Sequence, residues 1–393
     1  MGRTVTPVIS DHILKRARTR SPQLISSANL GTRKVSLPIL LASPKSPSTT
    51  SLLEVDEMLD KHIEIPVELY SPQSYQFMGF TKERALDLFE RFENGYDDSL
   101  DEGGFFLDIA VGFLSYDTTN AHDDGNDWIA AMNVMGIDHE LREAIMTPEY
   151  RDIRLTKDLI SWLVESIEIN FESLDSMNLI IEKSLDKLEA DPTLSHLREG
   201  ADTVIDPLVP QGHSRLYKSF FVRRIDGAGI ENSVFDLSRI LSPPRSDFAS
   251  TRCALYFTPQ KWLAVRYAEY ARKNVRIADV RTIEVHIPDI HFEEATRLDL
   301  AYGDEWRKLI FYSRKGMYYP DDVRKYYSRQ EIITGPIAHN YNDGFAKMED
   351  WGRVTDKHML LSSEGEVGIQ YVWIKERSWL RLQDEIKGKY YLH

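Results

Sequence analysis

The sequence predicts an α+β protein, in which a helical N-terminal domain precedes a β-rich domain of mixed and antiparallel strands. Between residues 53 and 200, apolar side chains recur every three or four positions, which is the spacing of one face of a helix. Beyond residue 212 the pattern changes to the two-residue alternation of half-buried strands, as in residues 281–287. Strands and helices do not alternate regularly there, which excludes a doubly wound parallel sheet.

The charge of the chain is unevenly distributed. Its 393 residues carry a net charge of −14, yet residues 1–50 hold eight Lys or Arg and one acid, so the remainder carries about −21. An acidic body repels other polyanions, so we expect no nucleic-acid partner for the folded part. No run approaches the roughly 18 to 20 apolar residues of a membrane span, so no transmembrane segment is expected.

Cys253 is the only cysteine, which excludes an intrachain disulfide and a cysteine-based zinc cluster. This usage is typical of a reducing compartment and predicts an intracellular protein, cytoplasmic or nuclear. We expect Cys253 to be a small buried side chain rather than a nucleophile.

Residues 1–52 are rich in Ser, Thr, Pro and Arg, and we expect them to form a disordered basic arm. Such a segment buries too little apolar surface to offset the entropy that it loses on ordering. Its Arg-rich and acid-poor composition is also that of a mitochondrial transit peptide, and Gly2 with Thr6 fits a loose myristoylation pattern. A plain tail and a targeting signal both remain open.

Residues 53–200 predict the helical domain. An apolar stripe over residues 159–167 predicts one helix, with Thr156 placed to cap it, and residues 80–92 and 128–135 predict two more. We interpret these stripes as core, with a partner-binding groove as the alternative.

Residues 120–127 resemble the start of a calcium loop. Such a loop needs a bidentate glutamate at its twelfth position, where this chain has Ala131. The scattered histidines show no paired ligand spacing either, so we predict a turn at this segment and no metal cofactor.

Residues 201–212 contain two prolines and a glycine and predict a linker, after which residues 213–393 form the β-rich domain. Thr258 followed by Pro259 is a strong start for a helix in this domain. Strands are predicted over residues 214–222, 254–257, 281–287, 309–312, 332–338 and 369–374.

Three segments of this domain form a candidate ligand site. The first is a strand with aromatic and basic residues, Arg215 to Ser219. The second runs from residue 254 into the helix that holds Tyr267, and in the third Glu331 opens an apolar strand. Aromatic side chains bury a flat ring, and an acid at a strand mouth orients a sugar hydroxyl or stabilises a cation.

The second segment resembles the poly(ADP-ribose) polymerase-like branch of the ADP-ribosyltransferase superfamily. In that branch a Tyr-Phe strand precedes a helix, and a second tyrosine follows eleven residues after the first. Here Tyr256-Phe257 is followed by Tyr267 at that same spacing. The resemblance covers roughly residues 213–375 and implies that the two tyrosine rings sandwich nicotinamide.

The third segment is similar to another motif of the family, a late glutamate that opens a strand and binds ribose. Glu331 is followed by Ile332-Ile333, and residues 335–338 are similar to an ending seen in small relatives of the branch. The resemblance therefore implies that Glu331 is catalytic.

The first segment departs from the family pattern. The family carries histidine or arginine after a tyrosine or tryptophan, then usually glycine, whereas this chain has Tyr217, Lys218 and Ser219. Lys218 lacks both the imidazole shape and the bidentate fork of arginine, although its ammonium can still donate to a ribose hydroxyl. We assign Lys218 a catalytic role beside Glu331, and Tyr217 and Ser219 roles in cofactor binding.

The resemblance implies an NAD⁺-dependent ADP-ribosyltransferase, or an NAD glycohydrolase, with NAD as substrate and a protein as the acceptor. Glu331 would stabilise the oxocarbenium-like transition state as nicotinamide leaves. The alternative is a catalytically inactive module of the same fold, which acts as a protein-interaction or regulatory scaffold through its helical domain. The poor match at Lys218 favours this alternative. A third alternative is a stand-alone scaffold whose C-terminal half has a different α+β fold, in which Tyr256 and Glu331 lie far apart.

Overall fold

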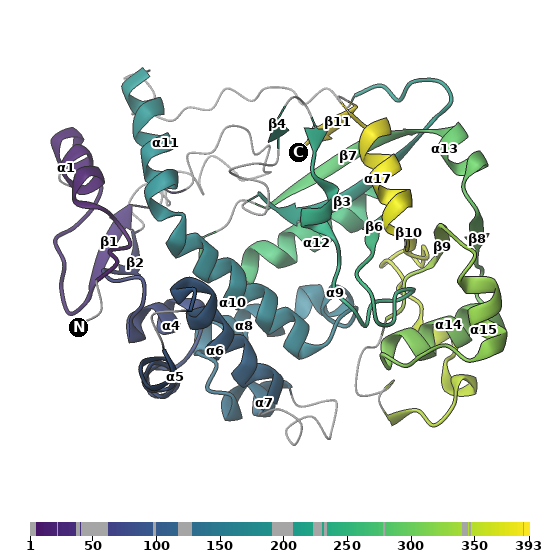
Figure 1. The fold of residues 1–393 in the computed structure, drawn as a ribbon, viewed down its shortest axis with the longest axis horizontal. Coiled ribbons are helices and arrows are strands. Elements are labelled where there is room, and N and C mark those ends of the chain that lie inside the picture. Colours follow the sequence, from purple (N-terminus) through teal and green to yellow (C-terminus); the bar gives the residue numbers. More distant parts are fainter. Residues whose placement is uncertain are drawn as a thin grey trace.

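The computed structural model describes residues 5–21, 23–36, 40, 62–96, 100–116, 128–190, 207–222, 230–231, 234–277, 280–339, 345, 347–387 and 389–393. Helices dominate the first half of the chain and strands gather in the second half (Figure 1). The predicted α+β class is therefore confirmed. No helix of the described ranges combines the length and the apolar character that crossing a bilayer requires.

The N-terminal segment is folded where it is described, so the prediction of a disordered arm is wrong for residues 5–36. Helix α1 (Asp11–Arg20) is capped by the Ser10 side chain, and strand β1 (Thr32–Ser36) pairs antiparallel with β2 (His62–Pro66). Ile13, Leu14 and Ala17 form a buried face on α1. Burial of this face offsets the entropy that the segment loses on ordering, which the polar composition of the segment could not offset by itself. Apart from Leu40, which is buried, the remainder of the predicted arm lies outside the described residues.

Helices follow β2 up to residue 190, so the predicted helical domain begins with a strand. They are α4 (Pro72–Met78), α5 (Lys82–Gly95), α6 (Glu102–Tyr116), α7 (Trp128–Val134), α8 (His139–Met146), α9 (Arg151–Arg154), α10 (Leu159–Asp175) and α11 (Met177–Ala190). Helix α10 is buried along much of its length and packs against α4 and α6 (Figure 1). We call residues 62–190 the helical part.

Asp158, and not Thr156 as predicted, caps α10, because the Asp158 side chain accepts a hydrogen bond from the Ser161 amide. Thr156 donates instead to the Ile153 carbonyl at 2.7 Å. The calcium-like segment, residues 120–127, lies outside the described residues.

Within its described residues, the second half contains two sheets and a short hairpin of two strands. One sheet has the order β11 (Tyr390–Leu392), β7 (Val280–Pro288) and β3 (His213–Phe221). The other has the order β6 (Leu255–Phe257), β10 (Ile369–Trp373), β9 (Ile332–Pro336) and β8 (Arg297–Asp299), and only β8 and β9 are parallel. The hairpin joins β4 (Ile230–Glu231) and β5 (Val234–Phe235).

A bridge between Tyr217 and Thr258 connects the two sheets through a pair of backbone hydrogen bonds of 2.7 and 2.9 Å. Strand β3 therefore lies beside the end of β6. The helices of this half are α12 (Lys261–Lys273), α13 (Asp289–Glu294), α14 (Asp304–Arg314), α15 (Asp321–Tyr327) and α17 (Glu376–Glu385).

The strand predicted over residues 309–312 is wrong, because these residues belong to α14. Trp306, Leu309, Ile310 and Ser313 are buried on this helix, which is the spacing of one helical face. The apolar run at residues 309–312 fits the two-residue period of a strand and the 3.6-residue period of a helix. Only the residues on either side of the run show that the helical period continues.

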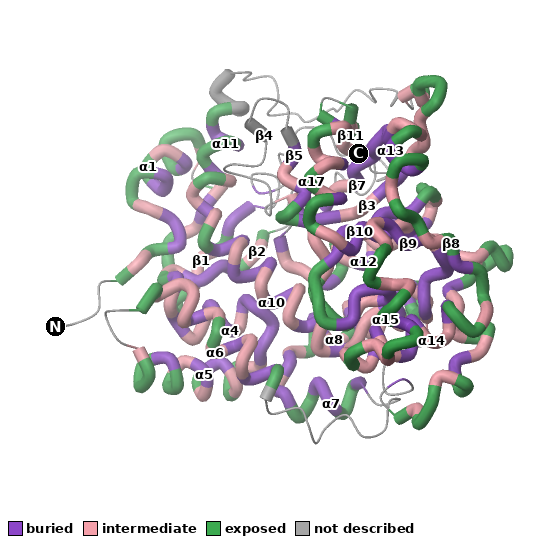
Figure 2. The backbone as a smooth tube through the Cα atoms, turned by 45° about the vertical axis from the view of Figure 1, so that its right-hand side comes forward, coloured by how far each residue is buried: buried purple, intermediate pink, exposed green. Residues whose placement is uncertain are grey.

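The apolar core lies on both sides of the sheets. Residues of β3, β6, β7 and β10 pack with α17 on one side, whereas α12 packs against β3 and β7 on the other. The core of the helical part continues without a break into the second half, where it includes Leu263, Tyr270, Ile277, Ile337 and Leu360. Figure 2 shows buried backbone running through the helices and the strands alike.

Candidate functional site

Tyr217 and Ser219 lie on the side of β3 that faces α12, and Tyr267 lies on α12 itself. Tyr217 and Ser219 alternate with Leu216 and Phe220 along β3, and the latter two belong to the core beneath α17. The Ser219 hydroxyl donates to the carbonyl of Ala264 on α12 at 2.5 Å. The structure thus brings the first and second sequence segments together.

Lys218 points the other way. Successive side chains of a strand alternate between its faces, so the Lys218 side chain lies on the face of Leu216, opposite Tyr217 and Ser219. A single ligand on the α12 side of the sheet cannot contact all three side chains of this run.

The two tyrosines of the second segment are partly buried, and their hydroxyl groups are engaged. The Tyr256 hydroxyl donates to the Ser246 hydroxyl at 2.7 Å, and the Tyr267 hydroxyl donates to the Thr156 hydroxyl of the helical part at 3.0 Å. Burial raises the pKa of both phenols, and the nearby carboxylate of Asp247 adds to this rise. The two rings belong to different hydrophobic clusters.

A buried ion pair lies close to both tyrosines. The side chains of Asp247 and Arg314 are 3% and 4% exposed and form a direct salt bridge. Asp247 also accepts hydrogen bonds from the Ala338 amide and from Gln370 Nε2, each at 2.7 Å. Burial raises the pKa of the Asp247 carboxyl, and the Arg314 guanidinium opposes this rise. Sequence reasoning missed this pair, because no local pattern marks a contact between an irregular loop and α14.

Arg314 also joins the two halves of the molecule. Its guanidinium donates to the carbonyl of Thr156 at 2.6 Å and to the carbonyl of Ala338 at 3.1 Å. The region between the helical part, α12 and the end of β9 is therefore occupied by a hydrogen-bonded network of the protein itself.

Tyr217 belongs to a second polar network, which the sequence did not indicate. Its hydroxyl accepts from Arg215 at 3.2 Å, and Arg215 Nε lies 3.1 Å from Glu284 Oε1. Glu284 is fully buried, and its two oxygens also lie 2.7 Å from His286 Nε2 and 3.0 Å from His393 Nε2. A fully buried carboxylate with three basic neighbours is a satisfied structural group.

Glu331 immediately precedes β9. Its carboxylate lies 2.8 Å from Arg377 and accepts from the Thr296 amide at 3.2 Å. Burial acts to raise the pKa of Glu331, but the Thr296 amide and the Arg377 guanidinium outweigh it and hold the pKa below its usual value. Glu331 is therefore ionised at neutral pH.

Glu331 lies at the opposite end of the strands from the β3 segment. The register pairs Tyr256 with Val372 and Val372 with Ile333, so Glu331 is two residues beyond the level of Tyr256. Tyr217 pairs with Thr258, two residues beyond Tyr256 in the other direction. Tyr217 and Glu331 are therefore four residues apart along the strand direction, which is about 13 Å at roughly 3.3 Å per residue.

A cleft of about 360 Å³ opens at the end of the strands where Glu331 lies. It is lined by Leu241, Arg252, Cys253, Ile374, Lys375, Glu376 and Trp379. Cys253 is exposed there, so the prediction that it is buried is wrong. Strand β6 begins at Leu255, and its neighbour Ala254 is buried and bridged to Ser242, whereas Cys253 precedes both and stays at the surface.

No three His, Cys, Asp or Glu side chains within the described ranges are arranged to hold a metal ion. Comparison with known proteins adds no assignment, since no protein-family model, no curated protein and no solved structure matches this chain. The resemblance to ADP-ribosyltransferases therefore stays a prediction that rests on the three sequence segments.

Proposed function

We propose that this chain is a catalytically inactive ADP-ribosyltransferase-like module that acts as a regulatory or protein-interaction scaffold through its helical part. One observation carries the proposal: Glu331 lies about 13 Å along the strands from Tyr217, and Lys218 lies on the opposite face of β3 from Tyr217 and Ser219, so the side chains expected to do chemistry do not converge with the β3 part of the site. For catalysis at the ribose of NAD⁺, the Glu331 carboxylate must lie within contact distance of that ribose when the nicotinamide ring is bound.

The surroundings of the tyrosines support the same proposal. The hydroxyl groups of Tyr256 and Tyr267 bond to the protein, and the Asp247–Arg314 ion pair lies near both. A nicotinamide ring that binds these tyrosines would have to do so beside a buried ion pair that is already hydrogen-bonded to the protein.

The scaffold role rests on how firmly the helical part holds α12. Arg266 of α12 forms two hydrogen bonds with the Asp152 carboxylate, at 2.7 and 3.0 Å. The Tyr270 hydroxyl donates to the Ile145 carbonyl at 3.0 Å. On the outer surface of the helical part, α7 keeps Ile129 and Val134 exposed, 49% and 66% respectively, as contact points for a protein partner.

The test is NAD⁺ binding by calorimetry together with nicotinamide release, measured on the purified protein, on Glu331→Ala and on Glu376→Ala. Glu376 is an exposed glutamate at the same edge of the sheet and serves as the matched control. We expect no nicotinamide release from any of the three proteins, and no effect of either substitution on stability beyond about 1 kcal/mol.

Nicotinamide release that is lost in Glu331→Ala and kept in Glu376→Ala would contradict the proposal and establish the enzyme. Binding of NAD⁺ without release would support a scaffold that senses the dinucleotide.

A further inference from the structure

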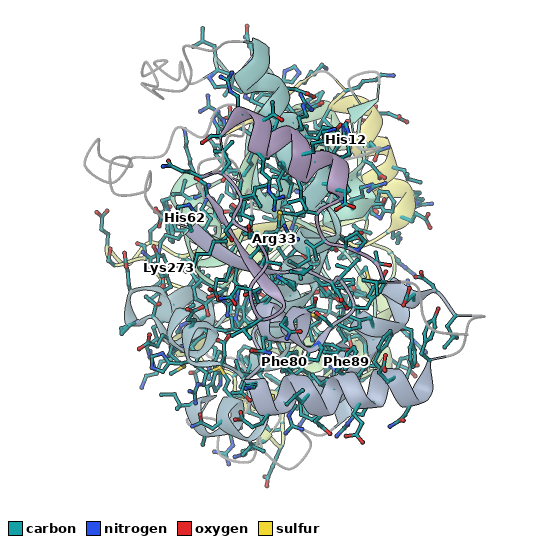
Figure 3. The ribbon with its side chains drawn as sticks, turned by 90° about the vertical axis from the view of Figure 1, so that its left-hand side faces the viewer. His12, Arg33, His62, Phe80, Phe89 and Lys273 are labelled. Carbon is teal, nitrogen blue, oxygen red and sulfur yellow. The ribbon has the colours of Figure 1, made fainter. Side chains whose placement is uncertain are left out.

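The folded N-terminal segment presents a basic surface on an otherwise acidic protein. Lys15, Arg18 and Arg33 make up this surface, which we call the α1–β1 basic surface. Lys15 and Arg18 are three residues apart on the exposed side of α1, so their side chains are neighbours. Figure 3 shows α1 above the β1–β2 ribbon, with Arg33 labelled between them.

Arg33 lies on the inner face of the ribbon. It pairs with Ile65, which is fully buried, and it shares its face with Val35, which is also fully buried. The Arg33 side chain is therefore directed toward the apolar interior beneath α1, and only part of it remains exposed.

One nitrogen of this guanidinium lacks an acceptor. Arg33 Nη1 is enclosed by the protein, and no acceptor within the described part of the chain takes a hydrogen bond from it. Buried donors are almost always paired with protein, with water or with an ion, so an enclosed donor without a protein partner indicates a bound species.

The neighbours of Arg33 indicate the charge of that species. Burial lowers the pKa of Arg33, the positive charge of Arg18 lowers it further, and Asp11 opposes the effect. The positive charges of Arg18 and Arg33 therefore act on each other, and an anion held by both would offset this repulsion. Arg16 differs from both, because it is held by an ion pair with Asp186 on α11.

We propose that Arg18 and Arg33, with Lys15 at the rim, bind the phosphate group of a small soluble ligand. The guanidinium fork matches the oxygens of a phosphate in a bidentate geometry. The rest of the chain carries a charge of about −21. This charge repels a membrane or a nucleic acid more strongly than a small anion, so we expect the ligand to be small. This site is independent of the proposed scaffold function.

The test is calorimetric titration of the full chain with inorganic pyrophosphate at constant ionic strength. We expect Arg18→Gln and Arg33→Gln each to weaken binding by roughly tenfold or more, since a charged hydrogen bond contributes about 1.5 to 3 kcal/mol. Lys34→Gln removes an exposed charge from the opposite face of β1 and is expected to change the affinity by less than about twofold.

Two further measurements keep the result interpretable. Arg33→Lys retains the charge but not the fork, and it is expected to bind more weakly than wild type while keeping the native circular dichroism. Vesicles of phosphatidylcholine with and without phosphatidic acid distinguish a lipid headgroup from a soluble phosphate. Absence of pyrophosphate binding, equal losses in all the variants, or binding to vesicles alone would each overturn the proposal.

Discussion

His339 follows β9 and lies where the two halves of the molecule meet. Its amide donates to the carbonyl of His358 at 2.7 Å, and its Nε2 atom is enclosed without a hydrogen-bond partner among the described groups. Burial, reinforced by the nearby Arg151 guanidinium, lowers the pKa of His339 to about 4. The folded protein therefore holds this imidazole neutral.

We predict that His339 makes the protein less stable below neutral pH. The pKa is lower in the folded state than in the unfolded chain, where it is about 6.5, so the unfolded state binds the proton first. Full stability is present above about pH 6.5 and declines as the pH falls toward 4. At pH 5 the expected loss from this residue is about 1 to 2 kcal/mol, which allows for partial solvent screening.

Urea unfolding of wild type and His339→Gln at pH 7 and pH 5 measures this contribution. The variant should lose less stability between the two pH values than wild type does. His12→Gln, which changes an exposed histidine of α1, should lose as much as wild type (Figure 3). An identical pH response in His339→Gln would show that the imidazole titrates normally in the fold.

At the scale of elements, α12 is the part of the second half that the helical part holds most closely. Its Tyr267 hydroxyl donates to Thr156 at 3.0 Å, and its Glu269 carboxylate accepts from the Tyr150 hydroxyl at 3.3 Å. The ring that the sequence assigned to nicotinamide thus serves as a contact between elements.

We predict that Tyr267 and Thr156 are energetically coupled. Tyr267→Phe should lower the free energy of unfolding by roughly 1 kcal/mol, because it removes one partly buried hydrogen bond, and Thr156→Val should lower it by roughly 1 to 2 kcal/mol, because it also removes the bond to the Ile153 carbonyl. The double variant should lose less than the sum, with a coupling of about 0.5 to 1.5 kcal/mol. A cycle of Tyr267→Phe with Asp321→Asn, an exposed residue of α15, is the control, and it should be additive within about 0.5 kcal/mol.

The elements also show where local patterns predict structure and where they do not. Strand β7 was predicted because its alternation is strict and long, whereas α14 was mistaken for a strand at residues 309–312 because a four-residue apolar run satisfies either period. Helix α1 was missed, since its apolar face consists of only Ile13, Leu14 and Ala17 and is buried by contact with α11.

At the scale of the whole molecule, the two halves share one hydrophobic core. Leu263 and Ile337 of the second half are buried in the same cluster as Leu163 and Ile167 of α10. The hydrogen bond from Arg314 to the Thr156 carbonyl crosses the same boundary. The helical part is therefore not a detachable domain.

We predict a single cooperative unfolding transition for the whole chain. Far-ultraviolet circular dichroism and tryptophan fluorescence should give coincident urea curves, because neither half can lose its core alone. Leu263→Ala should lower the free energy of unfolding by about 2 to 5 kcal/mol in both signals. Leu86→Ala, at a side chain that is 51% exposed, should cost less than about 1 kcal/mol. Two separated transitions would contradict the shared core.

By itself the sequence determined the α+β class, the strands at β3, β6, β7, β9 and β10, and the helices at α5, α7, α10 and α12. These follow from periodicity, which is a local property of the chain. The two predicted helix caps were wrong, because Asp158 caps α10, and α12 begins after Gln260, whose side chain makes no cap hydrogen bond, rather than at Thr258-Pro259. Only the tertiary structure decided which side chains meet. It directed Lys218 away from Tyr217, paired Asp247 with Arg314 and placed Glu331 at the opposite end of the strands from Tyr217. Strand register and the packing of distant elements set these contacts, and no local pattern encodes them.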